Sequence, residues 1–468
     1  MQKVSSLGQK SKKVAEVLVE FTAKNLTGFA GLVPFVEFAR RLGVEAVLDG
    51  CGEARQGRRY SQGRMIMAMV LGFVVGLDRL RDVAALRFDR VLLKALGWAH
   101  FPVQTTISRF LWAFTESRLA GLAQGMHQLL ERFRNGWKGH REIHLDLDSH
   151  VRTVHGATLE GAEKGYNPHK RGRLSYHPLL AFIGETRDFL CGRFRPGNTT
   201  SNGAVALLLR GLALLRWERF ERVTVRADSG FCYLEFIQAV EATPRARYAI
   251  ALKLYRHHQA RFAGIDYRPV GGSSPEEGLE IASYGSTDWS DGKERRTIVI
   301  RQKLPDESGP GIPGKQLKLF ELQGYAYRAI VTNIQDKSAE EVWREYNGRA
   351  CCENFIKEGI MMGLDVNATR TFLGNAAHFH IVMLGYNLLN WYKEFAIEPA
   401  PPEREQKVGR PLGEKPMRKQ ICQRLLQVPA TLAKSGRRLY LKLSADWPWR
   451  QQLETLVGRL LNWQPAWA

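Results

Sequence analysis

Carboxylates stand at the ends of two segments whose patterns are typical of β-strands. Residues 143–148 read Ile-His-Leu-Asp-Leu-Asp, so Asp146 and Asp148 point to the same face of a strand. Two carboxylates this close are costly unless a metal ion or basic groups offset their charge. Asp228 follows the apolar segment 222–227 and precedes Ser-Gly, at a strand end where α/β sheets place functional groups. A turn-forming aspartate or a helix cap is the alternative at both places.

A third carboxylate belongs to a segment with helical spacing. Tyr346, Arg349, Glu353 and Lys357 are separated by 3, 4 and 4 residues, which places a ring, a guanidinium, a carboxylate and an ammonium on one helical face. The alternative is a solvated helix with ordinary ion pairs between successive turns. The opposite side of the segment is also largely apolar, which favours a buried helix.

The charge of the chain indicates a polyanionic partner. Its 468 residues include 68 Lys and Arg against 47 Asp and Glu, a formal net charge of +21. Nucleic acid is the first expectation for such a balance. An anionic membrane is the competing one, but the sequence has no Lys-rich amphipathic helix and no apolar stretch of about 18 residues. We therefore expect no membrane association.

The six cysteines indicate neither zinc nor disulfides. They show no Cys-x-x-Cys spacing and no matching histidine pattern. We interpret them as reduced thiols of a cytoplasmic protein.

Periodicity divides the chain into helical and α/β parts. Helical spacing runs from Gly28 to about Arg134, and residues 102–112 resemble the start of a DNA-reading helix that presents Arg109. An ordinary capped core helix is the alternative there. Strands and helices alternate from Glu142, and Ser338 begins a helix with a capping box. The expected segments are a helical N-terminal DNA-binding region (1–135), the first part of an α/β core (140–254), a β-rich insertion without helical signal (255–335), the second part of the core with the Glu353 helix (336–398) and a basic helical C-terminal region (399–468).

Together these residues resemble the DDE transposases of bacterial insertion sequences. The third motif matches most of the signature Tyr, two residues, Arg, three residues, Glu that marks one branch, and the match is closest to the insertion-sequence thirteen-eighty group. The resemblance covers nearly the whole chain. The motifs that carry it are Tyr60-Ser-Gln-Gly, Gly76-Leu-Asp-Arg-Leu-Arg-Asp82, Thr106-Ile-Ser-Arg109-Phe, Asp148-Ser-His150, His155-Gly156, Gly165-Tyr166, Tyr176-His-Pro-Leu179, Asp228-Ser-Gly-Phe and Tyr346 to Glu353.

The sequence departs from the pattern of that branch at two places. Asp-Ser-Thr has become Asp148-Ser-His150, a change that we expect to be tolerated. The lysine expected at the position of Ile360 is absent, and the nearby base is Lys357, one helical turn earlier.

The resemblance implies an α/β fold with a ribonuclease H-like catalytic core, a β-rich insertion, a helical N-terminal DNA-binding region and a helical basic C-terminus. It also implies cleavage at terminal inverted repeats and strand transfer into target DNA, with both bound as double-stranded DNA by a homodimer. The alternatives are a metal-dependent nuclease without strand transfer and an inactive, transposase-derived DNA-binding protein.

The residues implied for catalysis and metal binding are Asp148, Asp228 and Glu353. Two Mg²⁺ ions about 3.5–4 Å apart, with Mn²⁺ as a substitute, would activate the attacking oxygen and stabilise the leaving one. Three carboxylates suffice because Mg²⁺ prefers hard oxygen ligands and keeps several waters. Asp146 is the alternative to Asp148, or a residue just outside the ligands, because both share one strand face.

The residues implied for DNA contact are Tyr346, Arg349, Lys357, Arg109 and Trp289. Arg349 could hold a phosphate with two parallel hydrogen bonds. Trp289 lies in the expected insertion, where related proteins stack a tryptophan in place of a flipped base, and packing in the insertion's own small core is the alternative.

Overall fold

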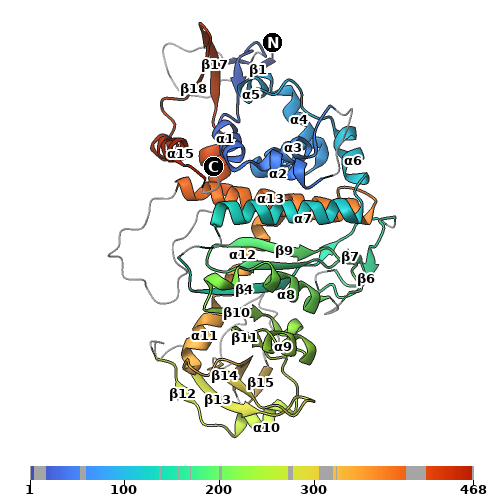
Figure 1. Cartoon of the computed structure of the whole chain (residues 1–468), viewed down its shortest axis with the longest axis vertical. Coiled ribbons are helices and arrows are strands. Elements are labelled where there is room, and N and C mark those ends of the chain that lie inside the picture. The colour runs from blue at the N-terminus through green and yellow to red at the C-terminus, as the bar shows by residue number, and fades with distance from the viewer. Residues whose placement is uncertain are drawn as a thin grey trace.

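A computed structural model of the chain describes residues 2–4, 17–19, 21–52, 59–135, 137, 139–156, 158–168, 170–199, 203–271, 278–304, 320–322, 324–396 and 418–465. Helices gather at one end of the molecule and a long mixed sheet runs away from them (Figure 1). None of the described helices is long and apolar enough to cross a membrane.

The centre of the sheet is formed by strands whose residues are mostly buried. β4 (Glu142–Ser149) pairs in parallel with β10 (Arg222–Ala227), and β10 pairs in parallel with β11 (Ala246–Ala251). On the other side of β4 lie the antiparallel strands β8 (Leu179–Ile183) and β9 (Asp188–Arg193). The full order is β12 (Arg268–Pro269), β13 (Leu279–Ser286), β14 (Arg295–Lys303), β16 (Tyr325–Thr332), β11, β10, β4, β8 and β9, and β15 (Phe320–Leu322) pairs with β16. The predicted α/β fold class is confirmed by this large mixed sheet.

The strands expected in a β-rich insertion extend this same sheet. β16 (Tyr325–Thr332) pairs antiparallel with β11 and continues the sheet through β14 (Arg295–Lys303) and β13 (Leu279–Ser286). The expectation that helix is absent from 255 to 335 was wrong, because α10 (His258–Ala263) lies within that range.

A long helix covers the outer edge of the sheet. α13 (Phe372–Ala396) runs beside α7 (Glu116–Arg134), between the N-terminal helices and β9 (Figure 1). The side chain of Asn387 on α13 hydrogen-bonds both backbone groups of Phe189, accepting from its N–H and donating to its carbonyl, each at 2.8 Å. An exposed edge strand is prone to pair with other chains, and this helix satisfies part of that edge.

Buried polar groups fasten the same helix to the core. Asp188 is fully buried and accepts hydrogen bonds from Arg134, Asn390 and Trp391. Charged groups are tolerated inside a protein only when paired and hydrogen-bonded in this way.

The segment 338–361 folds as two helices. Its capping box is confirmed, because the Ser338 side chain accepts from the Glu341 N–H and the Glu341 carboxylate accepts from the Ser338 N–H. α11 (Ala339–Asn347) ends before Gly348, and α12 (Ala350–Ile360) begins after Arg349. The expectation of one continuous helix was therefore wrong at a two-residue turn.

The C-terminal part is not all helical. β17 (Ala430–Ser435) and β18 (Arg438–Leu443) form a hairpin that pairs with β3 (Leu26–Thr27) near the N-terminus. α14 (Arg418–Ile421) continues into a π-helical turn (Cys422–Leu426), and α15 (Arg450–Asn462) packs on α13 and α1. Residues 397–417, part of the region predicted as basic and helical, lie outside the described residues.

The remaining elements complete the framework. The helices are α1 (Leu32–Leu42), α2 (Val44–Gly50), α3 (Gln62–Val75), α4 (Leu80–Ala85), α5 (Arg90–Ala95), α6 (Gln104–Trp112), α8 (Ala204–Ala213) and α9 (Leu234–Glu241). The strands are β1 (Gln2–Val4), β2 (Val17–Val19), β5 (Arg152–Thr153), β6 (Glu163–Lys164), β7 (Leu174–Tyr176), β12 (Arg268–Pro269) and β15 (Phe320–Leu322).

Candidate active site

Two of the predicted carboxylates lie side by side at the ends of neighbouring parallel strands. The pairing of β4 with β10 runs up to Leu147 opposite Ala227, and the next residues along the two strands are Asp148 and Asp228. Parallel pairing fixes this juxtaposition, because the carboxyl ends of both strands reach the same edge. Asp148 is 8% exposed, whereas the side chain of Asp228 is 43% exposed.

Asp228 also forms the turn that was the alternative explanation for it. Its Oδ1 accepts a hydrogen bond of 2.9 Å from the Gly230 N–H, which caps a short 3₁₀ turn. Its Oδ2 faces the guanidinium of Arg349. One oxygen therefore holds the backbone while the other faces the site.

Arg349 joins the two strand ends. Its Nη2 lies 3.7 Å from Asp148 Oδ2 and 3.9 Å from Asp228 Oδ2. Both distances are longer than a hydrogen bond, so the guanidinium balances the charge of the carboxylates without a close, directed contact. The turn between α11 and α12 delivers this side chain, which is 8% exposed, to the sheet.

Glu353 approaches from the first turn of α12. Its side chain is exposed, and its charge is near enough to raise the pKa of Asp148. Within the part of the chain that the structure describes, no three His, Cys, Asp or Glu side chains form a group that could hold a metal ion. Asp148 and Asp228 are brought together, and Glu353 is close to them without completing a cluster.

The electrostatics of this edge suit a divalent cation. The pKa of Asp148 is raised from 3.8 to about 6, chiefly by burial and also by the neighbouring charges of Asp228 and Glu353, against the lowering effect of Arg349. One guanidinium thus faces the two strand-end carboxylates, and the charge of Glu353 adds to theirs. The donor set fits Mg²⁺ or Mn²⁺, which favour oxygen ligands and would offset the remaining negative charge.

The raised pKa of Asp148 gives a pH-dependent stability in metal-free protein. A folded-state pKa above the unfolded one favours folding when the group is protonated, so this contribution is present below pH 3.8 and is lost as the pH rises through about 6. We expect the melting temperature of the wild type in EDTA to fall over this window relative to that of Asp148→Asn, which lacks the titration. The same pH profile in both proteins would contradict the expectation.

Asp146 is held away from this cluster. It is fully buried, and its Oδ1 and Oδ2 accept hydrogen bonds of 2.6 and 2.8 Å from Arg226 on β10. Arg226 also donates to the carbonyl of Glu345 on α11, at 2.5 Å. Both oxygens of Asp146 are thus engaged in joining two strands and a helix.

The other residues of the third motif do not all reach the carboxylates. Tyr346 lies near them, and burial raises the pKa of its hydroxyl, with further contributions from Asp228 and Asp148. Lys357 is exposed on α12. Its contact with a DNA end stays a prediction.

Arg109 lies on α6 and lines a different cavity, of about 700 Å³. The wall of this cavity also carries Arg59, Arg87, Arg90 and His100 and includes no acidic residue. Arg87 stacks 4.5 Å from the ring centroid of Phe88, which is 71% exposed. No ion pair involves these four arginines in the described part of the chain.

Trp289 lies between β13 and β14, and its described contacts do not include the strand-end carboxylates. Its ring is half-buried, and the guanidinium of Arg295 lies 5.4 Å from the ring centroid. Arg295 is paired with Asp291 and with Glu241 at the end of α9. The ring packs against the main hydrophobic core and not against a separate core of the insertion strands, which differs from the predicted alternative. Stacking on a DNA base stays a prediction.

Three residues near the site were given no individual role from the sequence. Arg226 completes the buried pair with Asp146, and His150 Nε2 lies 2.5 Å from Asp365 Oδ1, next to the end of β4. His177 lies within electrostatic range of Asp228. The alternation of β10 concealed the role of Arg226, because it shares a strand face with the polar residues Arg222 and Thr224, as on a solvent-facing side.

Comparisons with known proteins identify the class. A family model described as "Transposase DDE domain group 1" matches residues 9–465. The chain belongs to this family, and its class is that of transposases, which cut and transfer DNA and generally use divalent metal ions.

One solved structure similar to this chain is the cryo-EM structure of a piggyBac transposase synaptic complex with hairpin DNA. The TM-score is 0.42 at 11% sequence identity, over 94% of this chain and 85% of that one. No curated protein matches the sequence.

Proposed function

We propose that the protein is an insertion-sequence transposase that cuts DNA at the terminal inverted repeats of its element and joins the ends to target DNA. The observation that carries the proposal is the meeting of Asp148 and Asp228 at adjacent parallel strand ends, opposite Arg349. The sheet order β9-β8-β4-β10-β11 supports a ribonuclease H-like core. The Tyr346, Arg349 and Glu353 spacing supports the Tyr-Arg-Glu branch and, with the other motifs, the insertion-sequence thirteen-eighty group.

In this proposal Asp148, Asp228 and Glu353 hold divalent metal ions, Mg²⁺ or Mn²⁺. Such ions activate the attacking oxygen and stabilise the leaving one in phosphodiester chemistry. The exposed Glu353 side chain is free to turn toward the strand-end carboxylates, and Arg349 and Tyr346 lie where they can bind a phosphate of the DNA end. Asp146 and Arg226 position β4 and do not contact the reacting atoms.

The test is an in vitro reaction with purified protein, Mg²⁺ and a DNA fragment that carries the element's own ends. We expect cleavage at those ends, followed by joining to a second DNA. Cleavage without joining would favour the alternative of a metal-dependent nuclease. Binding without either product, in Mg²⁺ and in Mn²⁺, would favour a transposase-derived DNA-binding protein.

We further propose that the cavity around Arg109 binds double-stranded DNA through its phosphates. Its arginines, which form no ion pair among the described residues, and its lack of acidic lining residues support this role, because most protein–DNA contacts are made to the backbone. Two protein copies would be needed to bring two element ends together, so we propose a homodimer on DNA, which the mass of the protein–DNA complex tests.

We expect Arg109→Ala to weaken binding uniformly across DNA sequences. The slope of log affinity against log salt should become shallower by about 1, because one phosphate contact is lost. Arg81→Ala is a matched control, since Arg81 is exposed and already pairs with Asp82 at 3.3 Å. A salt titration by fluorescence anisotropy measures both, and an unchanged slope for Arg109→Ala would remove the cavity from the interface.

A further inference from the structure

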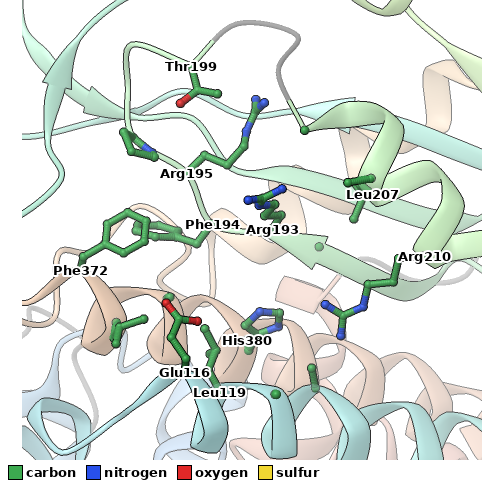
Figure 2. A pocket seen from close by; sticks show the side chains of 18 residues that line it. Glu116, Leu119, Arg193, Phe194, Arg195, Thr199, Leu207, Arg210, Phe372 and His380 are labelled. Atoms are coloured by element: carbon green, nitrogen blue, oxygen red, sulfur yellow. The ribbon is translucent and has the colours of Figure 1, made fainter. Parts of the chain in front are cut away.

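An open cavity of about 660 Å³ lies between the edge strand β9, the start of α8 and the first turns of α7 and α13 (Figure 2). One wall carries the guanidinium groups of Arg193, Arg195 and Arg210. The lining also has an apolar part, which includes Phe194 and Phe372. None of these residues was assigned a role by the sequence motifs.

The basic wall includes the N-terminus of a helix. Arg193 lies against Gly203, the residue before α8, because a Cβ added there would come within 3.0 Å of Arg193 Nη1. No side chain of the described residues caps this ten-residue helix, and its first turn holds no acidic residue. The N-terminus of a helix carries partial positive charge, so a guanidinium beside it is unfavourable unless an anion lies between them.

Two further basic side chains line the same cavity, one of them charged and the other neutral. Burial and the neighbouring Arg193 lower the pKa of Arg195 to about 10. Burial and Arg210 lower the pKa of His380 to about 3, so this histidine is neutral. His380 is 5% exposed, lines the cavity, and its Nδ1 has no hydrogen-bond partner among the described residues.

Arg193 and Arg210 have no carboxylate partner among the described residues. Glu116 is the one carboxylate among the cavity's lining residues, and no ion pair joins it to either of these two arginines in the described part of the chain. Arg193 and Arg210 are both exposed and form no ion pair within the same described ranges. By contrast, Arg216, six residues after Arg210, pairs with Glu131 at 2.5 Å.

The cavity adjoins the strand-end carboxylates through His177. Arg195 Nε donates to the His177 carbonyl at 2.8 Å, and His177 Nδ1 lies 2.9 Å from the carbonyl of Thr199, another lining residue. The charge of Asp228 acts on the same histidine. His177 therefore separates the basic wall from the carboxylate site.

We propose that this cavity binds one nucleotide unit of the DNA strand that is cut, with its phosphate between Arg193, Arg210 and the N-terminus of α8. The sugar and base would pack on the apolar part of the lining, at Phe194 and Phe372. The proposal rests on the proposed function, and it names the place where the strand is held beside the carboxylates.

The test combines protein variants with DNA in which single phosphates are replaced by neutral methylphosphonates. Binding is measured in EDTA by fluorescence anisotropy, so no cleavage is needed. For the wild type, we expect one neutral position close to the cleavage site to weaken binding by about tenfold, the effect of losing a charge-assisted contact. Arg193→Gln and Arg210→Gln should weaken binding of unmodified DNA similarly. In these variants, a methylphosphonate at that position should no longer lower the affinity further.

Arg219→Gln is the matched control, because it removes the same charge from an exposed arginine that does not line the cavity. It should keep the full methylphosphonate penalty. If Arg193→Gln and Arg210→Gln also keep it, the nucleotide proposal is overturned. Loss of free dAMP binding in these variants, without any change in the DNA penalty, would instead assign a mononucleotide site and equally overturn it. If the two arginine variants lose the methylphosphonate penalty as expected but the protein does not cleave DNA, only the proposed function is contradicted.

Discussion

Replacing Asp148 or Asp228 by Asn, or Glu353 by Gln, is expected to abolish DNA cleavage and joining while DNA binding is kept. Each change removes one anionic oxygen ligand and preserves the shape of the side chain. Metal ions contribute several kcal/mol to stabilising charge in such reactions, so loss of ~4 kcal/mol would slow cleavage by about 10³-fold. The rates of cleavage and joining on end-bearing DNA measure this directly, with binding followed in parallel.

Glu235→Gln supplies the matched control, because Glu235 is an exposed carboxylate in the first turn of α9, shortly after Asp228. It should cleave at the wild-type rate. Asp148→Asn or Asp228→Asn with normal cleavage in Mg²⁺ would show that the reacting phosphate lies elsewhere.

The second large effect concerns folding. Arg226→Met is expected to lower the free energy of unfolding by about 3–5 kcal/mol, because it leaves the fully buried charge of Asp146 without its partner. Urea denaturation of the metal-free protein measures this. Asp146→Asn should be destabilised for the converse reason, so a loss of activity in that variant would not identify a metal ligand.

Two variants make this prediction specific. Arg222→Met on the same strand removes an arginine whose side chain is 40% exposed and should cost no more than about 1 kcal/mol. The double change Asp146→Leu with Arg226→Met should recover stability, since apolar replacement of a whole buried pair is often neutral. Equal stability losses for Arg226→Met and Arg222→Met would show that the Asp146–Arg226 pair contributes nothing beyond an exposed one.

Sequence periodicity predicted the part of the site that depends on single strands. The strand expected at residues 222–227 is β10 with the same bounds, and Asp148 and Asp228 lie at strand ends as their positions indicated. Local alternation suffices there, because a strand's side chains are fixed by its own pleat.

Features that depend on distant pairing were not predicted. The spacing from Tyr346 to Lys357 could not reveal the turn at Gly348, since the contact between Arg226 and the Glu345 carbonyl is tertiary. The pairing of β16 with β11 is equally invisible in either segment alone, so the expected insertion was not recognised as a continuation of one sheet. The basic composition near the C-terminus concealed the alternating pattern of β18.

The helix that covers the sheet edge also has a mechanical consequence. α13 contacts α3, α6 and α7 on one side and β9 on the other, and Asn387 fixes its register on that strand. The helical layer that carries Arg109 is thereby rigidly coupled to the sheet that carries the carboxylates. If DNA is bound by the helical layer and cut at the sheet, α13 fixes the distance between the binding site and the cleavage site. The number of base pairs between the bound sequence and the cleavage site is then fixed by the fold.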